Sequence, residues 1–211
     1  DSPAGRRRAD RRAELFVEHG GLRPGVLALE LGCGTGVFLE KTAASGATIH
    51  GLDLSEDLLA KARARMAAAP HVRLDRGNAE AMPYPDRHFD AVYGSSVLHH
   101  LDLGAALREA FRVAKTGGRI VFAEPNLLNP QVVFMFNYGP AKERFGVSED
   151  EMAFTRFRAA RLLAAAGVPV VPSILVRAHG WARDPGALLS AIERAVSAAD
   201  PPCAPTCRCS A

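Results

Sequence analysis

A regular alternation of two kinds of segment between residues 26 and 125 most constrains the fold. Short apolar runs are typical of buried strands, and the stretches between them carry apolar residues at helical spacing. Strands are expected over 26–31, 47–53, 71–77, 88–95 and 119–125, and helices over 6–19, 36–45, 56–69 and from Asp102 to Thr116-Gly117-Gly118. This order predicts an α/β protein, a Rossmann-like doubly wound and mostly parallel sheet with helices on both faces.

The composition of the chain narrows its class. With 211 residues, 48% of them hydrophobic, it suits one globular domain with a real core. No apolar run approaches the roughly 20 residues that span a bilayer, and no secretory signal follows the N-terminal arginines. We therefore expect a cytoplasmic protein without a membrane span, either a monomer or a homodimer.

The net charge of +3 comes from the N-terminal segment, and the rest of the chain is balanced. The charged residues of this segment are Asp1, Arg6, Arg7, Arg8, Asp10, Arg11 and Arg12. A nucleic-acid-binding protein more often carries basic residues across the domain, so no nucleic-acid partner is expected. A solvated segment is the simplest interpretation, and attraction to phosphate or a membrane surface is the alternative.

The four cysteines predict neither a disulfide framework nor a metal site. Cys33 lies in a glycine-rich turn, while Cys203, Cys207 and Cys209 lie in the last nine residues. That C-x3-C-x-C tail has no fourth ligand at a suitable spacing, so we expect no bound metal.

A glycine-rich turn follows the first expected strand. Gly32, Gly34 and Gly36 allow a ligand to approach the backbone closely. A dinucleotide fingerprint, G-x-G-x-x-G, would have its third glycine where Val37 stands. Glu30 would repel a pyrophosphate but would suit a ligand with an ammonium or sulfonium group.

A second acidic residue, Asp53, ends the second expected strand. A carboxylate at this place can accept hydrogen bonds from two ribose hydroxyls, and the following Leu54 can cover one face of a base. The two strand ends together favour a nucleoside ligand with a positive charge and no pyrophosphate. S-adenosylmethionine has all three properties.

Four stretches of the sequence carry a family resemblance. They are LELGCGTG (29–36), HGLDLSEDLLAKARAR (50–65), VRLDRGNAEAMPYPDRHFDAV (72–92) and VLHHLDLGAALREAFRVAKTGGRIVFAEP (97–125). In this order they resemble the class I S-adenosylmethionine-dependent methyltransferases of the small-molecule type, over about residues 22–125. The resemblance implies S-adenosyl-L-methionine as cofactor, S-adenosyl-L-homocysteine as product and a small-molecule methyl acceptor as partner.

The resemblance also implies roles for single residues at the cofactor. Glu30 would lie near the methionine amino group, and Asp53 and Leu54 would hold the ribose and adenine. Asn78 stands where the family usually has Asp, and its amide oxygen can still accept a hydrogen bond from adenine, without a charge. The other positions implied in cofactor binding are Gly32, Cys33, Gly34, Gly36, Ala79 and Ser95.

Further candidates follow the fourth and fifth expected strands. His99 and His100 could act as general base, because imidazole titrates near neutrality, and the resemblance favours His100. Packing or capping of the next helix is the alternative. Glu124 and Asn126 could bind the substrate, or could simply end the strand. Aromatic residues over 132–145 could cover an apolar acceptor or could form core.

The second half of the chain is expected to depart from the family pattern. We expect residues 1–20 to form a helical segment, 21–125 a cofactor half, 126–199 a substrate-side half and 200–211 a tail without regular structure. Residues 168–176 read as a broken strand, and nothing after Ala199 has strand character. We therefore expect the antiparallel seventh strand of the family to be missing.

Three functions are compatible with these features. The first is methyl transfer to oxygen, nitrogen or carbon of a small molecule. The second is a non-catalytic S-adenosylmethionine-binding module, which the Asn78 departure and the missing strand would favour. The third is an NAD-type oxidoreductase, against which the glycine spacing and Glu30 argue.

Overall fold

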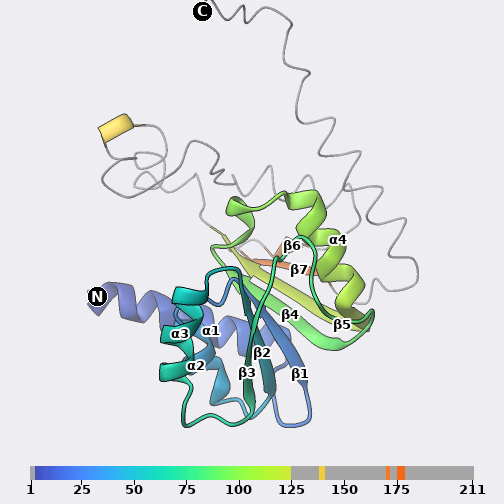
Figure 1. The fold of residues 1–211 in the computed structure, drawn as a ribbon, viewed down its shortest axis with the longest axis horizontal. Coiled ribbons are helices and arrows are strands. Elements are labelled where there is room, and N and C mark those ends of the chain that lie inside the picture. The colour runs from blue at the N-terminus through green and yellow to red at the C-terminus, as the bar shows by residue number, and fades with distance from the viewer. Residues whose placement is uncertain (1–2, 125–137, 141–169, 172–174, 179–211) are drawn as a thin grey trace, which may run out of the picture.

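The structure, a computed structural model, describes residues 3–124, 138–140, 170–171 and 175–178 (Figure 1). The sequence also predicts helices from Ser148 to about residue 166 and over 185–199. These two segments, most of the aromatic stretch and the C-terminal tail lie outside the described residues. The described part contains the whole of the alternating region up to the end of the fifth strand.

All five expected parallel strands are present. The helices are α1 (Pro3–Gly20), α2 (Val37–Ala43), α3 (Glu56–Arg65), the short 3-10 helix η1 (Leu98–His100) and α4 (Leu103–Val113). The strands are β1 (Leu27–Leu31), β2 (Thr48–Asp53), β3 (Val72–Arg76), β4 (Phe89–Ser95), β5 (Ala114–Ala123), β6 (Val170–Val171) and β7 (Leu175–Ala178). The α/β class predicted from the alternation is confirmed.

The strands form one sheet in the order β3-β2-β1-β4-β5-β7-β6. β1 pairs in parallel with both β2 and β4, and the further pairs β2–β3 and β4–β5 are also parallel. The chain therefore moves outward in one direction from β1 to β3 and then returns to the other side of β1. Ligands of such sheets bind beside this reversal, at the carboxyl ends of the strands.

The expectation of a missing seventh strand is wrong. β7 pairs antiparallel with β5, from Ile120 with Ala178 to Ala123 with Leu175, and β6 pairs antiparallel with β7. A broken strand is the simplest interpretation of the sequence because Pro172, which has no N–H to donate, interrupts an apolar run. In the structure β6 ends at Val171 and β7 begins at Leu175, so the strand beside β5 comes before residue 185 and not after Ala199.

The boundary between α4 and β5 also differs from the expectation. Asp102 caps α4 as expected, with its side chain accepting from the N–H of Ala105 at 2.7 Å. The helix ends at Val113, and β5 begins at once with Ala114. Gly117, with φ of +78°, lies inside an irregular stretch of β5, where the register with β4 shifts between Phe89 and Ala91.

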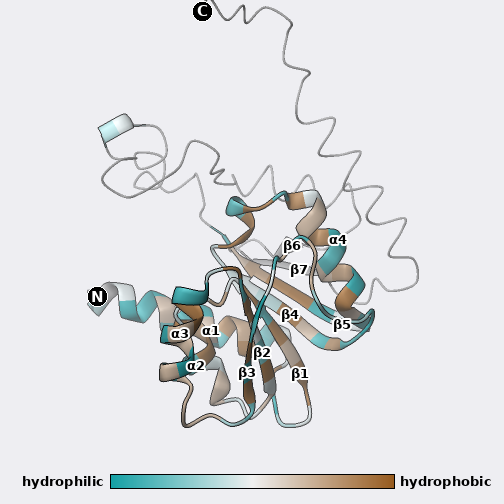
Figure 2. Cartoon of the chain, viewed as in Figure 1, coloured by the Kyte–Doolittle hydropathy of each residue, from teal (hydrophilic) through white to brown (hydrophobic). Residues whose placement is uncertain are grey.

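Apolar side chains cover both faces of the sheet. One cluster joins Phe16 of α1, Leu39 of α2 and Leu59 of α3 to the sheet, and the other joins Ala106 and Ala110 of α4 to the opposite face. Figure 2 shows the strands mostly in apolar colours and the helices with polar outer sides. Hydrophobic burial on both faces is what a parallel sheet requires. Among the described helices, none combines the length and apolarity needed to cross a bilayer.

Candidate functional site

The candidate site lies at the carboxyl ends of β1, β2, β3, β4 and β5. The glycine turn follows β1, Asp53 ends β2, Asn78 follows β3, Ser95 ends β4 and Glu124 follows β5. Because these strands are parallel, all five positions lie at the same edge of the sheet.

The three glycines of the turn have positive φ but different surroundings. A Cβ on Gly32, with φ of +61°, would lie 2.5 Å from Cγ2 of Val97, and one on Gly36 would lie 3.2 Å from Cβ of Ala62. These two glycines allow close packing within the protein. A Cβ on Gly34, with φ of +52°, would meet nothing within 4 Å. Gly34 therefore faces open space where a ligand can approach the bare backbone.

Asp53 is fixed beside that open space. Its Oδ2 accepts from the N–H of Gly34 at 2.8 Å, and its Oδ1 accepts from the N–H of Ser55 at 2.9 Å. Each carboxylate oxygen keeps further capacity to accept a hydrogen bond. The next residue, Leu54, has 65% of its surface exposed, which is unusual for a leucine in an otherwise well-packed region. An oriented carboxylate next to an exposed apolar side chain suits a ribose with its attached base.

The adenine candidates after β3 differ in exposure. Asn78 is exposed, and its Oδ1 accepts from the N–H of Glu80 at 2.9 Å, whereas Ala79 is buried. The amide oxygen of Asn78 thus already has one donor, and its second lone pair and NH2 group are what it can offer a ligand.

Glu30 is buried inside the sheet next to the glycine turn. It is 2% exposed, and burial raises its pKa to about 8, against a hydrogen bond from Tyr93 that lowers it. The hydroxyl of Tyr93 is also 2.8 Å from Oγ1 of Thr42 in α2. Within the described part of the chain, Oε2 of Glu30 has no hydrogen-bond partner. A buried acceptor without a donor is costly, and a ligand ammonium or an ordered water would satisfy it.

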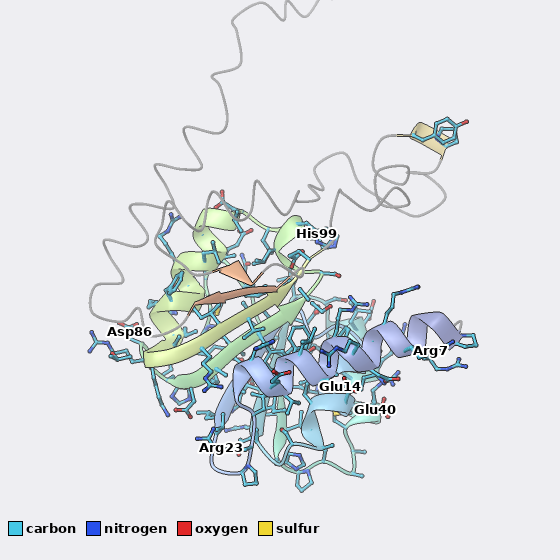
Figure 3. All side chains as sticks on the ribbon, turned by 180° about the vertical axis from the view of Figure 1, so that it is seen from behind. Arg7, Glu14, Arg23, Glu40, Asp86 and His99 are labelled. Atoms are coloured by element: carbon cyan, nitrogen blue, oxygen red, sulfur yellow. The ribbon has the colours of Figure 1, made fainter. Side chains whose placement is uncertain are left out.

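An arginine that the sequence did not single out also reaches this edge. Nη1 of Arg12, from α1, donates to Oγ of Ser95 at 3.0 Å, and its guanidinium carbon lies 5.2 Å from the ring centre of Phe38. Figure 3 shows Arg7 and His99 on one side of the molecule and Arg23 and Asp86 on the other. The N-terminal half of α1 therefore lies toward the candidate site. The helical pattern of residues 6–19 could not reveal which arginine points there.

Glu124 connects β5 to the turn after β4. Its Oε1 accepts from the N–H groups of Val97 and Leu98 at 3.0 and 2.9 Å, and its Oε2 lies 2.6 Å from Nδ1 of His99. Both oxygens thus accept hydrogen bonds within the protein, so this carboxylate holds η1 and orients His99. A contact of Glu124 with the substrate stays a prediction.

The two histidines of η1 lie against one another. Their ring centres are 4.0 Å apart, and His99 is buried with 8% of its surface exposed, whereas His100 is exposed. His99 therefore lies beneath His100, between it and Glu124. Cys33 is buried, with its N–H donating to the carbonyl of Leu52 at 3.1 Å, and burial raises the pKa of its thiol strongly. Asn126 lies outside the described residues.

These observations fit a cationic nucleoside as ligand. The open side of Gly34, the oriented carboxylate of Asp53 and the exposed Leu54 suit the nucleoside, and the unpartnered Oε2 of Glu30 suits a positively charged group. No residue of the glycine turn offers a cation to a pyrophosphate.

Comparison with known proteins shows similarity to one class of enzyme. Residues 29–122, which are less than half of the chain, match the family described as "Methyltransferase domain". The strand order and the glycine turn agree with this match.

Three similar proteins illustrate the relationship. Malonyl-[acyl-carrier protein] O-methyltransferase of Erwinia pyrifoliae is 38% identical over 113 residues, which cover 52% of this chain and 41% of that protein. Demethylmenaquinone methyltransferase of Symbiobacterium thermophilum is 37% identical over 116 residues, 52% of this chain and 46% of that protein. The solved structure of the [4+2]-cyclase SpnF is 34% identical with a TM-score of 0.52, covering 55% of this chain and 44% of that one. The matches thus span less than half the length of these relatives.

Proposed function

We propose that this protein transfers a methyl group from S-adenosyl-L-methionine to oxygen, nitrogen or carbon of a small-molecule acceptor. The observation that carries the proposal is the pairing of Gly34 with Asp53. The N–H of a glycine with an open side donates to a carboxylate at the end of the next strand, beside the exposed Leu54. The methyltransferase-domain match over residues 29–122 supports the same cofactor.

When bound, the cofactor supplies a sulfonium-activated methyl group, so the protein's task is mainly to bind and orient. In the proposal Asp53 accepts from the ribose, Leu54 and Ala79 border the adenine, and Asn78 accepts from its amino group. The glycine turn lies along the cofactor through Gly32, Cys33, Gly34 and Gly36. The methionine part is bordered by Glu30 and Ser95. Orientation of the acceptor at such a site can lower the activation barrier by about 7–11 kcal/mol.

His100 is the proposed general base for an acceptor that must lose a proton. It is exposed, so an acceptor can reach it, while His99 lies beneath and is held by Glu124. In this arrangement His99 and Glu124 are positioning residues that keep η1 at the edge of the site. Asn126 is kept as a proposed substrate contact.

The names of two relatives point to acceptors of different chemical classes. Two relatives are named for a malonyl-acyl carrier protein and for demethylmenaquinone, which differ greatly in structure. A screen of extract fractions for transfer of a radiolabelled methyl group would identify the acceptor of this chain.

The proposal is tested first by binding. Calorimetric titration of the full chain should give heat with S-adenosylhomocysteine and none with NAD. The Asp53→Ala variant should lose affinity for S-adenosylhomocysteine by about tenfold or more, because a charged hydrogen-bond acceptor is removed. Asp57→Ala is the matched control, since Asp57 is exposed in the first turn of α3. Absence of binding by the unaltered chain, or equal affinity in Asp53→Ala, would contradict the proposal.

A second function on the same domain follows from one comparison. The SpnF structure, 34% identical, is described as a [4+2]-cyclase and not as a methyltransferase. We therefore keep, as the alternative, a chain that binds the cofactor without methylating an acceptor. Binding of S-adenosylhomocysteine combined with no methyl transfer to any extract fraction would favour this alternative.

A further inference from the structure

Arg12 of α1 places a cation at the candidate site. Arg12 is half-buried at the carboxyl edge of the sheet, 83 residues before its hydrogen-bond partner Ser95. Within the described part of the chain, this partner is a neutral hydroxyl and not a carboxylate. Burial of a guanidinium without a carboxylate is unfavourable unless a ligand or solvent compensates it.

The groups around Arg12 define what it can bind. Its guanidinium lies against Phe38 in the first turn of α2, directly after the glycine turn, and beside the end of β4. Arg8 on the same helix and Glu124 after β5 are the charged groups that act on it. Burial and the charge of Arg8 lower the pKa of Arg12, whereas the charge of Glu124 raises it. An arginine nevertheless stays charged at neutral pH. The two oxygens of Glu124 are already occupied by η1 and His99, so this carboxylate is not its close partner.

We propose that Arg12 binds the α-carboxylate of the methionine part of the cofactor. The inference rests on the proposed function, because it concerns the same ligand. In that ligand the carboxylate is the group of opposite charge to Arg12, and none of the positions assigned above offers it a cation. The guanidinium has five N–H donors in a planar fork, and the contact to Ser95 uses Nη1. Such a fork matches a carboxylate in two-point contact.

Two side chains of opposite charge at the edge then bind different parts of the ligand. Asp53, at the end of β2, binds the ribose, and Arg12, near the end of β4, binds the methionine carboxylate. The open side of Gly34 lies in the turn that follows β1. α1 thereby becomes part of the binding site and not only a cover of the sheet.

The test compares two ligands that differ in one group. The full chain, Arg12→Ala and Arg12→Lys are titrated calorimetrically with S-adenosylhomocysteine and with its decarboxylated analogue. Arg12→Ala should weaken S-adenosylhomocysteine binding by about 10- to 100-fold, as expected for loss of a charged hydrogen-bonded pair, and should leave the analogue's affinity unchanged. Arg12→Lys keeps the charge but not the planar fork, so its affinity for S-adenosylhomocysteine should lie between those of the unaltered chain and Arg12→Ala.

A matched control is Arg11→Ala. Arg11 is exposed, next in sequence, and pairs with Glu14 on the outside of α1. It should leave the affinities for both ligands unchanged, and circular dichroism should show that all variants keep their melting transition.

The outcomes separate the two claims. Equal weakening of both ligands, or none, in Arg12→Ala would overturn the assignment of Arg12 while leaving the proposed function in place. Failure of the unaltered chain to bind S-adenosylhomocysteine would overturn both.

Discussion

Nδ1 of His99 lies 2.6 Å from Oε2 of Glu124, and this pair joins the end of β5 to the turn that follows β4. The other oxygen of Glu124 accepts from two consecutive backbone N–H groups, of Val97 and Leu98. One buried carboxylate thus fixes the start of η1, which carries both histidines of the candidate site. A carboxylate suits this place because all of its neighbours can donate.

Glu124→Gln should lower the free energy of unfolding by about 1–3 kcal/mol, because an amide has one acceptor oxygen and turns its NH2 group toward other donors. Urea denaturation measures the change. Glu56→Gln is the control, since Glu56 is exposed and pairs with Arg63 at the surface, and it should change stability by less than about 1 kcal/mol. Equal stability of Glu124→Gln and the unaltered chain would mean that the carboxylate does not hold η1.

His100→Ala should slow an O-methylation by about 10²-fold or more in kcat, because the exposed imidazole serves as base. His99→Ala should in addition destabilise the fold by about 1–3 kcal/mol, since it leaves a buried carboxylate oxygen without its donor. Single-turnover rates together with urea denaturation distinguish the two. An unaltered rate in His100→Ala would mean that η1 contributes to methyl transfer only by orienting the acceptor and not by removing a proton.

The stability of the fold should decrease as pH rises from about 4.5 to about 8, through Glu30. Its pKa is raised from the usual 4.5 to about 8 in the folded chain by complete burial. Between these values the unfolded chain has lost the proton and the folded chain retains it, so stability falls by at most about 1.4 kcal/mol per pH unit. Below the lower value the group is protonated in both states and contributes no pH dependence.

Glu30→Gln isolates this contribution. The difference in free energy of unfolding between Glu30→Gln and the unaltered chain should grow in favour of the variant from pH 5 to pH 8, in urea denaturation at each pH. A constant difference over that range would show that Glu30 is ionised in the folded chain.

Gly34→Ala should weaken S-adenosylhomocysteine binding by about tenfold or more, because the added Cβ projects into the open space beside Asp53. Its stability should fall by about 1–2 kcal/mol, the strain of a positive φ in an alanine. Gly25→Ala is the matched control, since Gly25 has φ of +85° and an equally open Cβ position but precedes β1. It should lose similar stability and keep its affinity. Equal affinity in both variants would place the ligand away from Gly34.

The parallel part of the sheet and its glycine turn could be predicted from the sequence. Strand and helix periodicity from residue 26 to 125 predicted the five parallel strands, and Ser55 and Asp102, which cap α3 and α4, are residue types that favour helix starts. These features were predictable because periodicity, capping and turn chemistry are read from residues close together in the chain. The positions of Gly34 and Asp53 at one edge then followed from the parallel arrangement.

Packing of the whole chain was needed to show which side chains meet across that edge. Arg12 contacts Ser95 across 83 residues of sequence, Glu124 holds η1, and β7 lies beside β5 although the sequence indicated no seventh strand. These contacts depend on how α1, η1 and β7 pack against the sheet, which residues close together in the chain do not reveal. Helical periodicity gives each arginine of α1 the same local character, and only packing selects the one that turns toward the ligand edge.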